Sequence, residues 1–387
     1  MRRGEFIFGA MVVALTIPSA AVAQAAVQRS AEHDYQLVTV ADGLVNPWSI
    51  AFLPGGDMLV TEKPGRLRII RNGALIPTPV AGVPEVFAQG QGGLLDVIPH
   101  PDFASNRLIY LSFSKPYADG EGATTAVVRG RFENDRLTNV EQIFEAVSRG
   151  AGHYGSRLAF DRQGYLFITV GDRQAPPSGN LEEHPAQDIS NHHGTTVRLH
   201  DDGRVPADNP FVGQQNARPE IWSYGHRNPQ GLAIHPETGE VWLTEHGPQG
   251  GDELNRVQRG ANYGWPVIGF GENYRTGRAI HEGTHREGME QPVNVWVPSI
   301  GTSGLLIYTG DRFPAWRGNM FAGGMVGQVV TRLVFDGPRI VRREAIAQGI
   351  GRIRDVRQGP DGLIYLAIDD NQGAPTRIVR LEPVANN

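Results

Sequence analysis

The chain has 387 residues, 36 lysine and arginine residues against 41 aspartate and glutamate residues, and a formal net charge of −5. This mildly acidic balance argues against a nucleic-acid partner or an anionic membrane surface. The sequence contains no cysteine, which excludes thiol catalysis, disulfides and cysteine-ligated zinc, so the core must be large enough to fold without cross-links.

The first segment, Met1–Ala26, has the pattern of an export signal. Arg2 and Arg3 precede a short apolar run, Phe6–Ile17, and Ala21-Val22-Ala23 fits a small-x-small cleavage site. We expect cleavage after Ala23 and an exported, water-soluble mature chain, most simply in a bacterial periplasm. The alternative is an N-terminal membrane anchor, but the apolar run is short for a bilayer span, and no later run is long enough.

The remainder is rich in turn formers, with 49 glycines and 27 prolines, and lacks long helix-periodic segments. One pattern recurs six times: an alternating apolar run, a turn with proline, aspartate or glycine, and a second apolar run. The six copies are Trp48–Lys63, Leu94–Ser114, Ser156–Arg173, Gln230–His246, Ser303–Gly324 and Ile353–Asp369.

Less regular strand-like runs follow most copies, so each copy reads as half of a four-stranded antiparallel sheet. Six such sheets predict an all-β fold, a six-bladed β-propeller that protects its strand edges by closing into a ring. We expect one domain over 35–383, a lead-in over 24–34 and a tail over 384–387, with long insertions at 174–215 and 273–297. Two stacked sandwiches, the alternative architecture, give no reason for six similar hairpins.

In a propeller the residues that flank each hairpin gather at one mouth of the central channel. Here these flanks carry chemically active groups: Gln91, His153, Asp172, Arg227, Asn228, Gly247, Pro248, Met325, Val326, Gly327, Arg352 and Arg354.

His153 and Asp172 lie about equally far from the turn at 162–164, so they are expected to face each other. A histidine held by a carboxylate is a general-base arrangement, because the carboxylate fixes the tautomer and favours the imidazolium. A purely structural hydrogen bond is the alternative. The sequence offers no nucleophile elbow for covalent catalysis.

The hairpin Gly231–Ile234 and Val241–Thr244 is expected to bring Arg227 and Asn228 beside 245–248. The Gly247-Pro248 bend exposes carbonyl oxygens, which suit calcium, and Asp252 and Glu253 follow as oxygen donors. The alternative is a polar loop at the edge of a blade.

Arg352 and Arg354 are two residues apart on a predicted strand and therefore point to the same side. Two such guanidinium groups repel each other unless an anion joins them, and arginine binds carboxylates or phosphates in a bidentate manner. Together with Arg227 they predict a small, multiply charged anionic ligand. The alternative is a salt-bridged strand edge with Asp355, which points to the opposite side. His192, His193, His200, His281 and His285 are interpreted as solvated loop residues.

Six motifs now define a resemblance: GQGGLLDV, GHYGSRLAFD, GHRNPQGLA, EHGPQGGDELN, GANYGWP and GRIRDVRQGPDG. In this order they resemble the soluble sugar dehydrogenases that depend on pyrroloquinoline quinone (PQQ). The chain is more similar to the compact aldose sugar dehydrogenase branch than to the longer soluble glucose dehydrogenases, and the resemblance covers essentially the whole mature chain.

The resemblance implies a periplasmic enzyme that oxidises the C1 hydroxyl of aldose sugars to the lactone, with hydride transfer to calcium-bound PQQ. His153 would be the general base, oriented by Asp172, and Arg227 would stabilise charge on the quinone oxygen. PQQ is a tricarboxylate, which agrees with the anion that the arginines predict. The implied cofactor-binding residues are Gln91, Arg227, Asn228, Tyr274, Met325, Val326, Gly327, Arg352, Ile353 and Arg354. The implied calcium ligands are Gly247 and Pro248, with Asp252 through water, and Glu253 and Tyr263 at a second ion.

The sequence departs from the family at Val326, where a lysine that contacts a cofactor carboxylate is common. Losing this contact would remove about 1.5–3 kcal/mol. We therefore expect either weaker PQQ binding, which Val326→Lys would tighten in a titration of the calcium-loaded apoprotein, or a compensating contact.

Two other function classes stay open from the residues alone. A calcium-dependent lactonase or hydrolase would need a carboxylate-based metal site in the channel, and a non-catalytic carbohydrate- or protein-binding propeller would need no His–Asp pair. The enzyme reading expects an artificial, quinone or cytochrome electron acceptor, no nucleic acid, no stable membrane insertion and a monomer.

Overall fold

The computed structural model describes residues 26–384, and almost all of its regular structure is β-strand. The predicted signal peptide, 1–23, lies outside the described residues. No helix within 26–384 is both long and apolar enough to cross a membrane.

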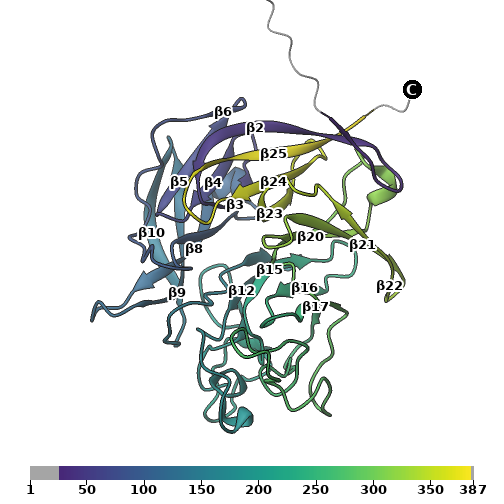
Figure 1. The fold of residues 1–387 in the computed structure, drawn as a ribbon. Coiled ribbons are helices and arrows are strands. Elements are labelled where there is room, and N and C mark those ends of the chain that lie inside the picture. Colours follow the sequence, from purple (N-terminus) through teal and green to yellow (C-terminus); the bar gives the residue numbers. More distant parts are fainter. Residues whose placement is uncertain (1–25, 385–387) are drawn as a thin grey trace, which may run out of the picture.

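Six antiparallel sheets form the molecule, and they confirm the predicted six-bladed propeller (Figure 1). Blades 1 to 3 comprise β3 (Pro47–Phe52), β4 (Met58–Glu62), β5 (Arg66–Arg71) and β6 (Ala74–Leu75); β7 (Leu94–Pro99), β8 (Leu108–Pro116), β9 (Ala123–Glu133) and β10 (Arg136–Glu145); and β11 (Leu158–Phe160), β12 (Leu166–Val170), β13 (Thr195–Leu199) and β14 (Ile221–Ser223). Blades 4 and 5 comprise β15 (Pro229–Ile234), β16 (Val241–Glu245), β17 (Asp252–Val257) and β18 (Asn294–Trp296); and β19 (Thr302–Ile307), β20 (Met320–Gly324), β21 (Val329–Asp336) and β22 (Arg339–Ile346).

Blade 6 joins the two ends of the chain. Its strands are β23 (Arg352–Gln358), β24 (Ile364–Asp369), β25 (Pro375–Pro383), β2 (Tyr35–Val45) and the short β1 (Val27–Gln28). β2 runs antiparallel to β25, with Tyr35 opposite Pro383, and Figure 1 shows the purple and yellow strands side by side. This pairing closes the ring. β1 adds a fifth strand from the segment that the sequence predicted as a lead-in.

The first strand of each blade contacts the first strand of the next, from β3 through β7, β11, β15, β19 and β23 back to β3. Hydroxyl groups of the second strands connect neighbouring blades. Thr61 donates to Leu95 O at 2.5 Å, Ser112 to Ser156 O at 2.6 Å, and Thr244 to Ser303 O at 3.0 Å. Because each buried hydroxyl is paired, these contacts align adjacent blades and offset the cost of removing the hydroxyls from water.

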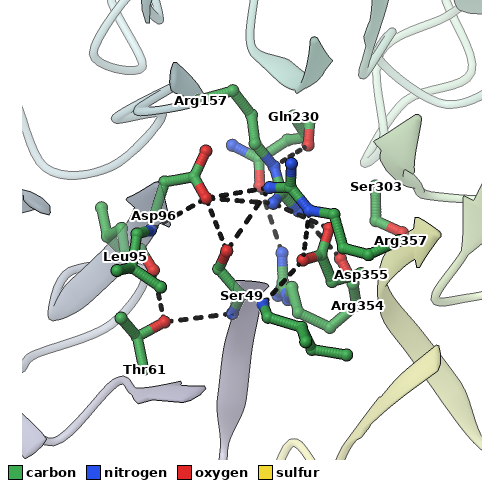
Figure 2. Close-up of polar contacts among 12 residues, drawn as sticks. Ser49, Thr61, Leu95, Asp96, Arg157, Gln230, Ser303, Arg354, Asp355 and Arg357 are labelled. Atoms are coloured by element: carbon green, nitrogen blue, oxygen red, sulfur yellow. Dashed lines mark hydrogen bonds and ion pairs between the residues drawn. The ribbon is translucent and has the colours of Figure 1, made fainter. Parts of the chain in front are cut away.

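A network of buried charges occupies the centre of the ring (Figure 2). Arg157 Nη1 lies 2.9 Å from Asp355 Oδ1 and 3.7 Å from Asp96, while Arg357 binds both carboxylates at 2.9 Å. Ser49 Oγ donates to Asp96 at 2.5 Å. The network joins blades 1, 2, 3 and 6, and two carboxylates balance two guanidinium groups. The Asp355 carboxylate therefore pairs with Arg157 and Arg357 in the channel, and not with Arg352 or Arg354.

The apolar core lies mainly between blades, in clusters such as Leu59, Leu67, Val97 and Leu111 between blades 1 and 2. The long connections of blades 3 and 4 lie together at the bottom of Figure 1. Gln187 of one connection donates to Trp265 O of the other at 2.8 Å. β18 lies inside the segment that the sequence assigned to an insertion.

Candidate functional site

Two adjacent cavities open where the blade flanks meet. The arginine pocket, of about 500 Å³, draws residues from all six blades: Trp48, Gln91, Gly155, Asn228, Met325 and Arg354. The histidine pocket, of about 410 Å³, is lined by His153, Asp172, Arg227, Pro248, Trp265 and Tyr274. Gln91 and His246 line both cavities, so the predicted flanks do converge on one face.

His153 and Asp172 form the predicted pair. His153 Nδ1 lies 2.6 Å from Asp172 Oδ1, and both side chains are buried. The His153 backbone N–H donates to Gln91 Oε1 at 2.8 Å, and the His153 backbone has a positive φ of 45°. A positive φ outside glycine is strained, and such strain is common at functional positions.

The electrostatics fix the tautomer of this pair. Burial raises the pKa of Asp172 on its own, but the charge and hydrogen bond of His153, with Arg227, bring it below its ordinary 3.8. The ionised carboxylate can only accept, so Nδ1 of His153 carries the proton and Nε2 keeps its lone pair. Burial lowers the pKa of His153 below its ordinary 6.5 against the opposing charge of Asp172. His153 is therefore a neutral base at neutral pH.

Trp265 completes this group, and the sequence analysis gave it no role. Its indole Nε1 donates to Asp172 Oδ2 at 2.7 Å, and its ring lies under the Arg227 guanidinium, 5.2 Å from Cζ to the ring centroid. Trp265 thus holds both a carboxylate and a cation of the histidine pocket. The available signal was its place in the GANYGWP motif, whose tryptophan carried no assigned function.

Arg227 is fixed by the hairpin β15–β16, as predicted. Its N–H donates to Glu245 Oε2 at 2.6 Å, and its Nη1 donates to Gly247 O at 2.7 Å. Its Nε is buried without a hydrogen-bond partner in the described chain. Asn228 is buried and accepts from Gly155 N at 3.3 Å, so its side chain lines the arginine pocket while bracing blade 3.

Arg352 and Arg354 project into the arginine pocket from the same side of β23. Their nearest carboxylate is Asp369, at 3.9 Å and 3.7 Å, too far for hydrogen bonds. Burial lowers the pKa of Arg354 to about 10, with Asp369 opposing the effect. The Nε atoms of both arginines are buried and unpartnered in the described chain. These orphaned donors fit an anionic ligand.

Other predicted cofactor-binding residues are placed differently. Met325 and Val326 line the arginine pocket, and Val326 is 69% exposed. Tyr274 lies in the histidine pocket, where its hydroxyl is 3.4 Å from Gly247 O. Ile353 is fully buried in the core, and Gly327 lies outside both cavities, with its N–H bonded to Ile300 O. Neither Ile353 nor Gly327 therefore lines the arginine pocket.

Four of the predicted metal ligands, Gly247, Pro248, Glu253 and Tyr263, line a small cavity of about 20 Å³. Burial raises the pKa of Glu253 to about 8, and the charge of Glu245 adds to this effect. A cation beside Glu253 would offset that burial cost.

The side chains of two predicted metal ligands, Asp252 and Tyr263, already form hydrogen bonds with the backbone. Asp252 accepts backbone N–H groups of Gly247, Gly301 and Thr302 at 2.7–3.1 Å, so it braces the bend. The Tyr263 hydroxyl binds backbone groups of Arg256 and Gln258, which leaves only its carbonyl for an ion. Within 26–384 no group of three or more His, Asp or Glu side chains is arranged to hold a metal, so any ion here would depend on carbonyl oxygens.

The prediction of solvated loop histidines is wrong for two residues. His192 is buried, 2.9 Å from Glu220 and 2.8 Å from Val147 N. His281 packs edge-on against Trp265 and bonds Pro266 O at 2.7 Å. Both corrections have the same cause: the long connections fold back over the blades.

The comparisons with known proteins agree with this geometry. A family model described as Glucose / Sorbosone dehydrogenase matches residues 44–380. Aldose sugar dehydrogenase YliI of Escherichia coli (strain K12) is 44% identical over 340 residues, which covers 86% of this chain and 89% of that protein.

Solved structures are similar over the same range. The crystal structure of a glucose dehydrogenase matches with a TM-score of 0.84 at 46% identity, covering 91% of this chain and 100% of that chain. The PQQ-bound form of an aldose sugar dehydrogenase from Streptomyces coelicolor matches with a TM-score of 0.72 at 28% identity, covering 90% and 98%.

Proposed function

The chain belongs to the glucose/sorbosone dehydrogenase family, and from this premise we propose that it oxidises the C1 hydroxyl of aldose sugars to the lactone with bound PQQ and calcium. When bound, PQQ would supply a hydride acceptor for C1 of the sugar, and calcium would supply Lewis acidity toward the quinone. The observation that carries the proposal is the convergence of two features on one face of the propeller. One is the neutral His153 imidazole held by the Asp172 carboxylate, and the other is the set of Arg227, Arg352 and Arg354, whose buried Nε donors have no partner in the described chain.

The arginine pocket suits the cofactor. PQQ is a planar tricarboxylate, and a cavity of about 500 Å³ is of the size that usually holds a small-molecule cofactor. Arg352 and Arg354 would take carboxylates in charge-assisted hydrogen bonds, which would satisfy their orphaned Nε donors. Arg227, at the border of the two cavities, would face the charge that develops on the quinone oxygen.

The histidine pocket suits the sugar. His153 Nε2 is the free acceptor, so it would take the proton of the C1 hydroxyl. Asp172 would stabilise the resulting imidazolium, and Trp265 would keep Asp172 in place. Gln174, Asn273 and Tyr274 provide polar groups around the remaining ring hydroxyls.

Calcium would be bound by the carbonyl groups of Gly247 and Pro248, with Asp252 reaching it only through water. A second ion would use Glu253 and the Tyr263 carbonyl, where it would stabilise the ionised form of the partly buried Glu253. We also propose export to the periplasm after cleavage behind Ala23, a single domain over 35–383, a monomer, and a quinone, cytochrome or artificial dye as acceptor.

One assay tests this function. Purified apoprotein is mixed with PQQ and calcium, and aldose-dependent dye reduction is measured, with omission of PQQ or calcium as controls. Activity that requires both additions is the expected result. A calcium-dependent hydrolase would instead open a lactone without PQQ, and a non-catalytic propeller would bind sugar without reducing the dye.

A further inference from the structure

Lysine is rare in this chain. Of its 36 lysine and arginine residues, only Lys63 and Lys115 are lysines. Lys115 forms an ordinary exposed ion pair with Glu145 at 2.6 Å. Lys63 instead lines the arginine pocket, together with Arg352, Arg354 and Asp369.

The Lys63 backbone is clamped between two blades. Its N–H donates to Asn46 O at 3.1 Å, and its carbonyl accepts from Leu94 N at 3.1 Å. Its half-buried side chain is directed by one hydrogen bond, from Nζ to Gly90 O at 2.9 Å. Gly90 precedes Gln91, whose side chain holds the His153 backbone. The ammonium group therefore lies at the loop shared by the two cavities.

The charges around Lys63 are not balanced. The arginine pocket contains three positive side chains, Lys63, Arg352 and Arg354, but a single carboxylate, Asp369. No carboxylate within 26–384 lies at ion-pair distance from Lys63 Nζ. Burial lowers the pKa of Lys63, and Arg354 and Arg352 lower it further, while Asp369 opposes them. An ammonium has three donors, and only one is used here.

We propose that Lys63 is a cofactor-binding residue that holds one carboxylate of the bound tricarboxylate together with Arg352 and Arg354. This inference rests on the proposed PQQ dependence. It also supplies the compensating contact that the sequence left open at Val326, because both residues line the same cavity.

The presence of two lysines allows a test on the unmodified protein. Apoprotein with calcium is acetylated with and without saturating PQQ, and the modification of each lysine is followed by peptide mass spectrometry. We expect PQQ to protect Lys63 and to leave Lys115 unchanged. Equal acetylation of Lys63 in both samples, when PQQ is shown to be bound, would overturn the inference.

Binding measurements on variants complete the test. In a fluorescence titration with PQQ, Lys63→Met is expected to raise Kd about ten-fold or more, as for a lost charge-assisted hydrogen bond, while Lys115→Met keeps the wild-type Kd. Adding Val326→Lys to Lys63→Met is expected to recover part of the affinity. Wild-type affinity in Lys63→Met would refute the role of Lys63 but not the proposed function, whereas failure of the wild-type protein to bind PQQ would remove both.

Discussion

Trp265 donates its indole N–H to Asp172 Oδ2 at 2.7 Å, although the two residues are 93 positions apart in the chain. Asp172 in turn holds His153 through its other oxygen at 2.6 Å. A loop residue of blade 4 thus helps to fix the orientation of His153, the proposed base, at the edge of blade 3. The proposed catalytic geometry therefore depends on contact between the long connections of these two blades.

The first prediction concerns this contact. Trp265→Phe keeps an aromatic ring beneath Arg227 but removes a hydrogen bond to an ionised carboxylate, a loss of about 1.5–3 kcal/mol. We expect kcat for aldose oxidation to fall about ten-fold or more, with little change in PQQ affinity. Trp242→Phe is the matched control, because Trp242 is equally buried and its indole N–H has no partner in the described chain. Equal kcat in the two variants would show that the hydrogen bond from Trp265 to Asp172 is not needed for catalysis.

The second prediction concerns pH. Because burial lowers the pKa of His153 below 6.5, the imidazole stays neutral into mildly acidic solution and is lost as a base only as pH falls through that lowered pKa. The acid limb of kcat/KM, measured between about pH 4 and pH 8, should therefore lie below 6.5. Asp172 raises the pKa of His153, so Asp172→Asn should lower the plateau and move the limb to still lower pH. A limb that moves to higher pH would contradict this assignment.

The third prediction concerns a close approach of backbones. A Cβ added at Gly171 would lie 2.2 Å from the His153 carbonyl oxygen, so Gly171→Ala must displace the segment before β11 that carries His153. We expect kcat to fall at least about ten-fold, in line with the sensitivity of catalysis to misplacement of about 1 Å. Gly283→Ala is the control, since its Cβ would meet only His285 O at 3.9 Å. Full activity in Gly171→Ala would show that the position of His153 is not critical.

The fourth prediction concerns the charge network in the channel. Asp355→Asn would leave Arg157 and Arg357 with Asp96 as the only carboxylate, and an uncompensated buried charge costs about 3–5 kcal/mol. We expect a loss of this order in the free energy of unfolding, measured by urea denaturation. Asp336→Asn, which breaks only an exposed pair with Arg339 at 3.9 Å, should change it by less than about 0.5 kcal/mol. Similar values for both variants would show that the network is not a stabilising element.

The same network has a defined pH dependence. Burial alone raises the pKa of Asp355, but Arg157 and Arg357 bring it below its ordinary 3.8. A lowered folded-state pKa contributes stability above the unfolded-state value and loses it as pH falls through the folded-state value. The contribution of Asp355, taken as the difference between wild type and Asp355→Asn, should therefore shrink in strong acid.

The fold could be predicted from sequence because its signals are local. Alternating apolar residues and Asp-Gly or Pro turns define each inner hairpin, such as Gly231–Ile234 with Val241–Thr244, which pairs in the predicted register. Hairpin flanks are then equidistant from their turns, so the pairing of His153 with Asp172 followed without any long-range information. Six motifs in order identified the family, and the family match confirms it.

What the sequence did not predict depends on tertiary packing. Trp265, Lys63 and Asp369 reach the two cavities from different blades, and no local periodicity relates them. His192 and His281 lie in polar loops, a composition typical of solvated segments. Only the fold of those loops buries His192 and partly buries His281. Ile353 lies between two arginines that face the arginine pocket, and strand alternation turns its side chain into the core.

In the proposed reaction a single base, His153, takes the proton of the sugar beside a cofactor that the neighbouring cationic groups hold. The most direct measurement is single-turnover reduction of bound PQQ by an aldose, followed by absorbance, in calcium-loaded wild type and in His153→Ala. The account predicts that His153→Ala binds PQQ with the wild-type Kd and reduces it about 10²–10⁴-fold more slowly. Reduction at the wild-type rate in His153→Ala would contradict it.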